Sequence, residues 1–355
     1  MRRALALAGA RVGLTTPNPS VGCVLVRGRR IVGQGATGVG GRPHAEAVAV
    51  AKAGRLARAA TAYVSLEPCA HTGKTPPCAK TLVEAGVARV VVGCLDPYPP
   101  VRGRGVAILR RAGMAVEIGV LEDECRRLNE GFFTRVKRRR PFGILKLAMS
   151  LDGKIAAASG DSQWISSEES RAIVHRWRRE CDAIVVGAGT VIADNPRLTC
   201  RLAHGRDPMR VVVDARLRVS PRALMFTEPS EAGAILVTTR GNLARARRRY
   251  ASARVEVIAC GDSRGRIDLR GMMLEFGRRG WCKVIFEGGA HLAASALDAG
   301  IIDRVALFVA PKVVGSGLSA IEGLDTRRIR DSIRLADLSI RRIGGDILLQ
   351  ARPLR

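Results

Sequence analysis

The sequence is poor in aromatic residues, and it contains no long hydrophobic run. Only 4% of its 355 residues are aromatic, so few rings are available to stack on single-stranded bases. No apolar run reaches the roughly 18 residues of a membrane span, and the first residues offer no signal-peptide cleavage site. We therefore expect a cytoplasmic protein with no membrane partner, and the nine cysteines fit a reducing compartment.

Acidic residues are also few, which leaves a large positive charge. The chain has 59 Lys and Arg against 32 Asp and Glu, a formal net charge of +27. Such an excess raises the question of nucleic-acid binding. The basic residues are almost all arginine, with only eight lysines, and they are spread along the whole chain. This dispersion favours a solvated basic surface, so we do not expect nucleic acid as a partner.

Through the first 135 residues, short apolar runs alternate with segments of helical periodicity. Strands that alternate with helices are typical of an α/β layered domain. The predicted strands span residues 21–26, 31–35, 62–66 and 89–94, and the predicted helices span residues 3–12, 44–53, 77–85, 105–111 and 121–134.

A basic segment then interrupts this pattern. Five basic residues lie between Arg135 and Arg140, and Pro141 follows them. Because proline stops a helix and restricts the residue before it, we predict an exposed hinge here.

A second α/β pattern begins at Phe142 and does not repeat the first. Its predicted strands span residues 143–148, 183–186, 211–214, 234–238, 255–259, 283–286 and 304–309, and its predicted helices span residues 168–179, 243–250, 271–278 and 290–299. We therefore predict two different domains, residues 1–138 and residues 142–355.

His44, Cys69 and Cys78 supply one imidazole and two thiols, and Glu46 lies two residues after the histidine. Catalytic zinc takes three protein ligands and a water, whereas structural zinc takes four. The pattern is the zinc-deaminase signature, in which the metal activates water for attack on an amino-bearing ring carbon. We predict that His44, Cys69 and Cys78 bind Zn²⁺. Glu46 would carry the proton from the water to the ring nitrogen and the leaving ammonia.

Two neighbouring residues bear on this site. His71 lies between the cysteines, and as a fourth ligand it would make the zinc structural. We expect instead that His71 lines the pocket or orders the loop. Pro68 suits a helix start at Cys69, where peptide N–H groups would favour the thiolate.

The long spacing between the thiols and a motif near the start of the chain resemble one enzyme family. Cys69-Ala-His-Thr-Gly-Lys74-Thr-Pro-Pro-Cys78 replaces the Cys-x-x-Cys of nucleoside deaminases, and Thr16-Pro17-Asn18-Pro19 precedes it. Both segments closely resemble the deaminase half of the bifunctional riboflavin-biosynthesis deaminase/reductases.

This resemblance implies a cytidine-deaminase-like three-layer domain and a phosphorylated pyrimidine substrate. It implies that Asn18 and Lys74 contact that substrate. Tyr98 departs from the asparagine that is common in the family, which leaves any contact from its loop open.

Polar and glycine-rich segments follow predicted strands in the second half. They span residues 145–154, 160–166 and 187–201, and Glu287-Gly288-Gly289 precedes a predicted helix. A glycine pair there lets backbone amides approach a phosphate at the helix N-terminus. Gly187-Ala188-Gly189 lacks the third glycine of the Rossmann fingerprint.

Together these segments resemble the reductase half of the same family, over roughly residues 142–315. The resemblance implies a dihydrofolate-reductase-like fold and NADPH as the cofactor. The cofactor contacts implied by it are Ala148, Trp164, Thr190, Asp194, Gly288 and Gly289. The substrate contacts implied by it are Ser162, Arg178, Leu198, Arg201 and Glu287.

We therefore predict a bifunctional enzyme of riboflavin biosynthesis. Its first reaction would be zinc-dependent hydrolytic deamination of 2,5-diamino-6-(5-phosphoribosylamino)pyrimidin-4-one. Its second would be NADPH-dependent reduction of the ribosyl side chain to ribityl. Arg178 and Arg201 suit the ribose phosphate because a guanidinium fork binds phosphate oxygens bidentately. Lys154, beside Asp152, is a candidate acid or orienting group for the reduction.

Two rival functions and one assembly question stay open at this point. The charge favours a basic zinc deaminase acting on nucleic acid with an accessory second domain, whereas the thiol spacing and the reductase motifs oppose it. A protein with purely structural zinc is opposed by Glu46 and by the presence of only three strong ligands. The sequence is compatible with a homo-oligomer but does not define one.

Overall fold

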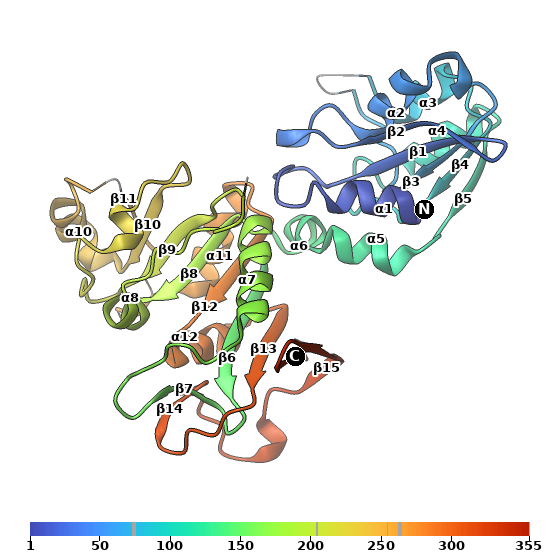
Figure 1. Ribbon diagram of the computed structural model, residues 1–355. Helices are drawn as coiled ribbons and strands as arrows, with labels where there is room; N and C mark the ends of the chain where they lie inside the picture. Colours follow the sequence, from blue (N-terminus) through green and yellow to red (C-terminus); the bar gives the residue numbers. More distant parts are fainter. Residues whose placement is uncertain (73–75, 204, 254, 262–264, 355) are drawn as a thin grey trace. The chain divides into compact units, whose positions relative to one another are not determined.

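The chain folds into two compact units, Met1–Arg139 and Arg140–Arg355. The structure is a computed structural model that describes residues 1–72, 76–203, 205–253, 255–261 and 265–354. Figure 1 shows that each unit is built on a β-sheet flanked by helices. Within the described residues, no helix has the length and apolar composition needed to span a bilayer.

The N-terminal unit contains a five-stranded sheet with the order β2-β1-β3-β4-β5. β1 is antiparallel to both β2 and β3, and β3, β4 and β5 are parallel to one another. The strands are β1 (Gly22–Arg27), β2 (Arg30–Ala36), β3 (Thr61–Val64), β4 (Arg89–Val92) and β5 (Ala115–Ile118). The helices are α1 (Arg2–Gly9), α2 (Ala45–Ala53), α3 (Cys78–Glu84), α4 (Arg104–Arg111), α5 (Glu122–Leu128) and α6 (Glu130–Arg138).

Glycines let helices approach this sheet closely on both faces. A Cβ at Gly33 would collide with Ala49 of α2, and a Cβ at Gly22 would collide with Ala4 of α1. Gly22 and Gly33 point to opposite faces, because Gly33 pairs with Leu25, an odd number of residues from Gly22. The helices therefore cover both faces and make a three-layer α/β unit (Figure 1).

Two predictions for this unit need correction. The helix predicted over residues 121–134 is two helices, because Asn129 ends α5 and its side chain bonds the backbone N–H and C=O of Ser20 at 2.8 and 2.9 Å. β5 was not predicted, since its short sequence is largely exposed and carries no alternating pattern.

The predicted hinge is also only partly correct. Residues 137–139 are exposed, but α6 continues through Arg138. Arg140 is buried, and its guanidinium donates to both oxygens of Asp303 at 2.6 and 2.9 Å. A sequence pattern of consecutive basic residues gave no sign of this buried partner 163 positions away.

The C-terminal unit contains a nine-stranded sheet with the order β11-β10-β9-β8-β12-β6-β13-β16-β15. The first seven strands in this order are parallel, and β16 and β15 continue the sheet antiparallel. The strands are β6 (Phe142–Ser150), β8 (Ala183–Gly187), β9 (Met209–Val213), β10 (Ala234–Thr238), β11 (Val255–Ala259), β12 (Lys283–Glu287), β13 (Arg304–Ala310), β15 (Leu335–Ile343) and β16 (Asp346–Pro353). A separate pair joins β7 (Lys154–Ala157) to β14 (Gly317–Ser319).

Helices lie on both faces of this sheet, as expected for parallel strands. They are α7 (Glu168–Glu180), α8 (Ala188–Asp194), α9 (Leu224–Thr227), α10 (Leu243–Arg249), α11 (Leu269–Arg278) and α12 (Ala290–Asp298). Alternate residues of β8 enter two separate cores: Ile184 joins the core with α7, and Val185 joins the core with α11 and α12. This unit has the dihydrofolate-reductase-like α/β fold.

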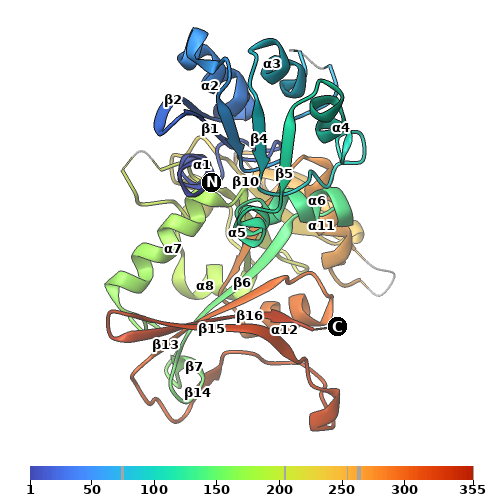
Figure 2. The same cartoon turned by 90° about the vertical axis from the view of Figure 1, so that its right-hand side faces the viewer.

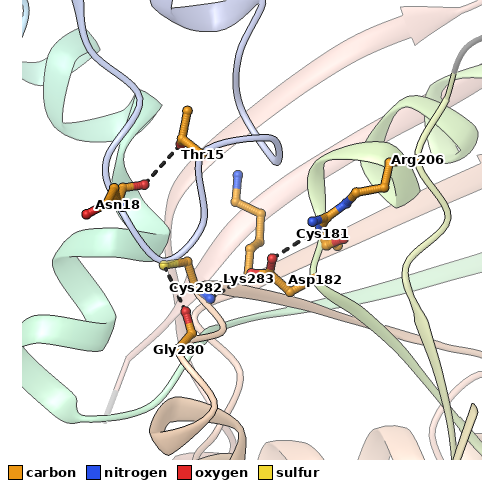
Figure 3. A network of polar contacts seen from close by, with 8 residues as sticks. All are labelled: Thr15, Asn18, Cys181, Asp182, Arg206, Gly280, Cys282 and Lys283. Atoms are coloured by element: carbon orange, nitrogen blue, oxygen red, sulfur yellow. Dashed lines mark hydrogen bonds and ion pairs between the residues drawn. The ribbon is translucent and has the colours of Figure 1, made fainter. Parts of the chain in front are cut away.

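The amino ends of β8 and β12 are fixed by the carboxylate of Asp182. It accepts hydrogen bonds from the backbone N–H groups of Cys282 and Lys283 at 2.7 and 3.0 Å, and from Arg206 at 3.1 Å (Figure 3). This network lies at the amino ends of the strands. The polar and glycine-rich segments lie at the opposite, carboxyl ends.

The C-terminal hairpin of β15 and β16 was not predicted. β16 lies beside β13, and β15 lies next to β16 at the edge of the sheet (Figure 2). β15 is exposed along most of its length, so its sequence lacks the alternation that identifies a half-buried strand.

Candidate functional site

The imidazole and the carboxylate of the metal motif lie at the start of α2. His44 is the N-cap of this helix, and Glu46 lies in its first turn. A carboxylate is favourable there because the N-terminal end of a helix carries partial positive charge. Glu46 is only 3% exposed, whereas His44 is half-buried.

The two thiols come from different local structures. Cys69 lies in the loop after β3, and Cys78 is the first residue of α3, directly behind Pro77. The helix start predicted at Cys69 is therefore wrong, and Pro77 with Cys78 takes that place. The backbone N–H of Cys78 donates to Cys69 Sγ at 3.2 Å.

These three side chains meet at one point. His44 Nδ1 lies 3.1 Å from Cys78 Sγ and 3.6 Å from Cys69 Sγ, and all three ligand atoms are within 4.8 Å of one another. Two ligand atoms bound tetrahedrally to one zinc at roughly 2.0–2.3 Å lie about 3.6 Å apart. The geometry and the donor set therefore fit a zinc ion with three protein ligands.

The electrostatics of the cluster also favour a thiolate. The Cys78 thiol donates to Cys69, and this hydrogen bond lowers the pKa of the Cys69 thiol to about 4. Burial and, to a smaller extent, the negative charge of Cys69 together raise the pKa of Glu46 to about 7. A carboxyl group with such a pKa can both accept and donate a proton near neutral pH.

Other residues predicted for this half lie nearby in the fold. Asn18 Nδ2 donates to the carbonyl of Gly40 at 3.4 Å, and Thr15 Oγ1 donates to the carbonyl of Asn18 at 3.0 Å (Figure 3). Gly41 has a φ of 90°, and a Cβ there would collide with the Asn18 side chain. Asn18 is therefore held against the segment that leads into His44. Lys74 lies outside the described residues.

His71 is exposed and is not part of the three-residue cluster of described metal-ligating side chains. Its ring meets the ring of Tyr98 edge-on, with centroids 6.4 Å apart. The arrangement matches a loop-ordering contact rather than a fourth ligand.

The C-terminal unit contains a cavity of about 1760 Å³ along the carboxyl ends of its parallel strands. Ligand sites in open α/β sheets are typically found at this edge. The cavity brings together all eleven residues that the sequence predicted for this half: Ala148, Ser162, Trp164, Arg178, Thr190, Asp194, Leu198, Arg201, Glu287, Gly288 and Gly289.

Arg178 and Glu287 form a two-point ion pair in this cavity, at 2.9 and 2.8 Å. A third guanidinium N–H of Arg178 donates to the carbonyl of Thr199 at 3.0 Å. Burial would raise the pKa of Glu287, but the charge and hydrogen bonds of Arg178, together with Lys146 and His175, outweigh burial and lower that pKa. This differs from the expectation that the fork binds a phosphate, because Glu287 already occupies it.

Lys146 is a cavity residue that the sequence analysis did not select. It projects from β6, and its pKa is lowered by burial and raised by the nearby Glu287, with a net lowering. The available signal was a single charge within the apolar strand over residues 142–150. An amine in this environment is suited to transfer a proton.

A tight turn follows β12. Gly288 and Gly289 have φ values of 71° and 83°, and Gly289 is the N-cap of α12. A Cβ at Gly288 would lie 3.2 Å from Thr190 Oγ1. Backbone amides can therefore approach a ligand between this turn and α8, as a phosphate group requires.

Two loop residues line the outer side of the cavity. Ser162 Oγ donates to the Asp194 carboxylate at 3.4 Å. Trp164 is 57% exposed, and the Arg171 guanidinium lies 4.5 Å from its ring centroid. The backbone carbonyl of Trp164 accepts a hydrogen bond from Lys312 Nζ at 2.6 Å, so this loop is tied at several points.

Lys154 does not join this arrangement. Its Nζ donates to Ser319 Oγ at 3.3 Å, and Lys154 is not among the described residues that line the cavity. Asp152 accepts hydrogen bonds from Ser150 and from the backbone of Gly315. Asp152 thus orders the turn after β6, and Lys154 joins β7 to β14, so Lys146 replaces Lys154 as the candidate proton donor.

Comparison with known proteins covers both units. The RibD C-terminal domain family matches residues 141–349, and the family described as cytidine and deoxycytidylate deaminase zinc-binding region matches residues 1–94.

Full-length relatives and solved structures agree with these family matches. The riboflavin biosynthesis protein RibD of Aquifex aeolicus is 40% identical, over 98% of this chain and 96% of the relative. That of Escherichia coli K12 is 38% identical, over 98% and 97%.

Among solved structures, the deaminase/reductase of Thermotoga maritima has a TM-score of 0.88 at 36% identity, covering 100% of this chain and 97% of its own. Acinetobacter baumannii RibD has a TM-score of 0.87 at 36% identity, covering 100% and 98%.

Proposed function

The chain belongs to the RibD family of bifunctional riboflavin-biosynthesis deaminase/reductases, and from this premise we propose which of its residues perform each reaction. The cofactors of the two reactions are zinc and NADPH, and the substrate is a phosphorylated pyrimidine. We assign deamination to residues 1–138 and reduction to residues 142–355. The observation that carries this assignment is the separate clustering of a three-ligand metal site and of the eleven cavity residues.

In the N-terminal unit, His44, Cys69 and Cys78 hold the zinc. When bound, the metal would lower the pKa of a water molecule and so supply a nucleophile near neutral pH. As the water oxygen bonds to the amino-bearing carbon of the pyrimidine, Glu46 moves one proton of the water to the ring nitrogen. Glu46 then moves the second proton to the amino group, which leaves as ammonia. Its pKa of about 7 suits both roles. Asn18 and Lys74 contact the substrate.

In the C-terminal unit, NADPH supplies a hydride to C1 of the opened ribose. Thr190, the Gly288–Gly289 turn, Asp194, Ala148 and Trp164 hold the cofactor. The close approach of Thr190 to Gly288 supports a phosphate position between them.

The substrate side of the same cavity is formed by Ser162, Leu198, Arg201 and the Arg178–Glu287 pair. Lys146 lies beside Glu287 and supplies the proton that accompanies the hydride. Arg178 positions Glu287, because three of its five guanidinium N–H groups donate to that carboxylate and to the Thr199 carbonyl. Arg201 is then the arginine available to the ribose phosphate.

We also propose the location and the oligomeric state of the enzyme. All nine cysteines are free, which supports a cytoplasmic location. Exposed Leu338, Ile340 and Ile347 on the β15–β16 hairpin support a homo-oligomer. Cell fractionation and sedimentation at several protein concentrations test these two proposals.

The assignment is tested on the full chain with its pyrimidine substrate and NADPH. Ammonia release and NADPH oxidation are measured separately, together with zinc content. The Glu46→Gln variant is expected to retain zinc and NADPH oxidation on pre-deaminated substrate but to lose ammonia release, because an amide cannot carry the proton. Wild-type ammonia release in this variant would remove Glu46 from the mechanism.

A further inference from the structure

Five arginines lie on three neighbouring segments at one end of the cavity in the C-terminal unit, and two of them line the cavity itself. Arg216 and Arg218 line the cavity from the loop after β9. Arg240 lies in the short 3-10 helix η3 (Arg240–Asn242), and Arg245 and Arg249 lie in α10. These five residues are called the arginine rim.

Hydrogen bonds hold the two parts of the rim together. Asn242 Nδ2, at the end of η3, donates to the carbonyl of Ala215 at 2.8 Å. Arg249 Nη2 donates to the carbonyl of Val219 at 3.1 Å. Arg245 lies one turn before Arg249 on the same side of α10, so it faces the same loop.

The positive charge of the rim is not neutralised by ion pairs. All five side chains belong to exposed residues, and within the described part of the chain none of them pairs with a carboxylate. Asp214 in the same loop is only 2% exposed, and its oxygens accept the backbone N–H groups of Arg216 and Val219 at 3.2 and 2.8 Å. The oxygens of Asp214 are thus taken up by backbone groups, and Asp268, which also lines the cavity, accepts the backbone N–H of Gly271 at 2.9 Å.

The sheet order places this rim on the route of the cofactor. β9 lies two strands from β12, or about 10 Å at ordinary strand spacing, with β8 and Thr190 between them. The same cavity runs from Glu287 and Gly288 past Thr190 to Arg216. A dinucleotide held at Gly288 and Thr190, as the proposed function assigns, therefore extends toward the rim.

We propose that the arginine rim attracts anionic dinucleotides and accelerates their entry into the reductase cavity, and that it favours NADPH over NADH. Clefts lined by one sign of charge raise association rates by roughly 10–1000-fold. The extra phosphate monoester of NADPH carries about −1.5 to −2 charges at pH 7, so NADPH feels the field more strongly. The inference rests on the proposed cofactor site and adds a kinetic role for residues outside it.

Stopped-flow fluorescence on the full-length enzyme measures association and dissociation of NADPH and of NADH without turnover. The Arg216→Glu/Arg218→Glu variant is expected to bind NADPH on the order of tenfold more slowly at low ionic strength, with little change in dissociation. The loss should be smaller for NADH and should fade at high salt, where the screening length drops to about 3 Å. The neutral Arg216→Gln/Arg218→Gln variant is expected to have an NADPH association rate between those of the wild type and of the Glu variant.

The matched control is Arg341→Glu/Arg342→Glu on β15, two exposed arginines at the opposite edge of the same sheet. It is expected to leave both rate constants unchanged, although it changes the net charge in the same way. Equal association rates in wild type and in both rim variants would overturn the proposal. Faster dissociation with unchanged association would also overturn it, because the arginines would then act by direct contact. Failure of the wild-type enzyme to bind NADPH would instead reject the cofactor site itself.

Discussion

Arg178 and Glu287 are joined by two parallel side-chain hydrogen bonds, from Nε to Oε1 at 2.9 Å and from Nη2 to Oε2 at 2.8 Å. Their side chains are only 13% and 10% exposed. Arg178 comes from α7 and Glu287 from the end of β12, so the pair fixes a helix to the strand end that borders the cavity. Such two-point pairs combine strength with a defined orientation.

Breaking this pair should destabilise the C-terminal unit. Arg178→Gln leaves the Glu287 charge without its partner, and removal of one member of a buried pair typically costs about 3–5 kcal/mol. All three tryptophans lie after residue 140, so tryptophan fluorescence during urea unfolding reports on this unit alone. Arg341→Gln, on the exposed strand β15, is the control and should change stability little. Equal unfolding midpoints for the two variants would contradict a stabilising role for the pair.

The same pair predicts how stability depends on pH. Arg178 holds the pKa of Glu287 below its ordinary value, so the folded state favours the carboxylate. A carboxylate with a depressed pKa stabilises the fold above its unfolded pKa and loses that contribution as pH falls through the folded pKa. Wild-type stability should therefore decline on acidification below about pH 4.3.

In Arg178→Gln the sign should reverse, because burial alone raises the pKa of Glu287. That variant should gain stability, relative to wild type, as the pH falls and Glu287 takes up a proton. Parallel pH profiles of the two proteins would show that Glu287 does not titrate as we infer.

The zinc assignment predicts different consequences for two buried cysteines of one unit. Cys78→Ala should lose bound zinc and ammonia release, because it removes one of three ligand atoms that lie within 4.8 Å of one another. Cys94→Ala removes an equally buried thiol outside that group and should retain both zinc and activity. Metal analysis of the purified variants provides the measurement. Full zinc occupancy in Cys78→Ala would reject the ligand set.

The parts of the fold that follow from local pattern could be predicted from the sequence. Apolar strands such as β10 and helices such as α12 carry their periodicity in consecutive residues. The metal residues were predicted from a motif whose spacing is specific, and the eleven cavity residues were predicted from the family resemblance of the segments that contain them. β15 could not be predicted this way, because an exposed edge strand does not need alternation.

Partners distant in sequence were the main features that could not be predicted. Arg140 belongs to a run of exposed basic residues and is distinguished only by Asp303, which the fold brings to it. We expected Arg178 to bind phosphate. The sequence could not show that the Arg178 guanidinium is paired with the carboxylate of Glu287. Lys146 could be selected only from the structure, which places β6 between β12 and β13 in the sheet and Lys146 in the lining of the cavity.

Arg201 should be the arginine that binds the substrate phosphate. It is exposed, lines the cavity, and has no carboxylate partner among the described residues. Arg201→Ala should weaken binding of the phosphorylated substrate in the reduction step by about 1.5–3 kcal/mol, seen as a raised KM. Arg201→Lys should restore part of the loss. An unchanged KM in Arg201→Ala would show that the substrate phosphate binds elsewhere in the cavity.

Separation of the two units should leave two working proteins. α6 ends at Arg138, and the next buried contact of the chain is that of Arg140 with Asp303 in the second unit. A break after Arg138 therefore preserves both α6 and this ion pair. The fragment 1–138 should bind zinc and release ammonia, and the fragment 139–355 should bind NADPH and reduce the deaminated substrate.

A break after Arg140 is the informative comparison, because it removes Arg140 from its buried partner. Asp303 also accepts the backbone N–H of Gly143 at 2.9 Å, so its carboxylate would stay buried without the two charged donor groups of Arg140. The fragment 141–355 should therefore unfold at a lower urea concentration than the fragment 139–355. We expect its free energy of unfolding to be lower by about 3–5 kcal/mol. If ammonia release and NADPH oxidation both disappear in folded fragments, the two reactions depend on one another, and the assignment of independent domains is wrong.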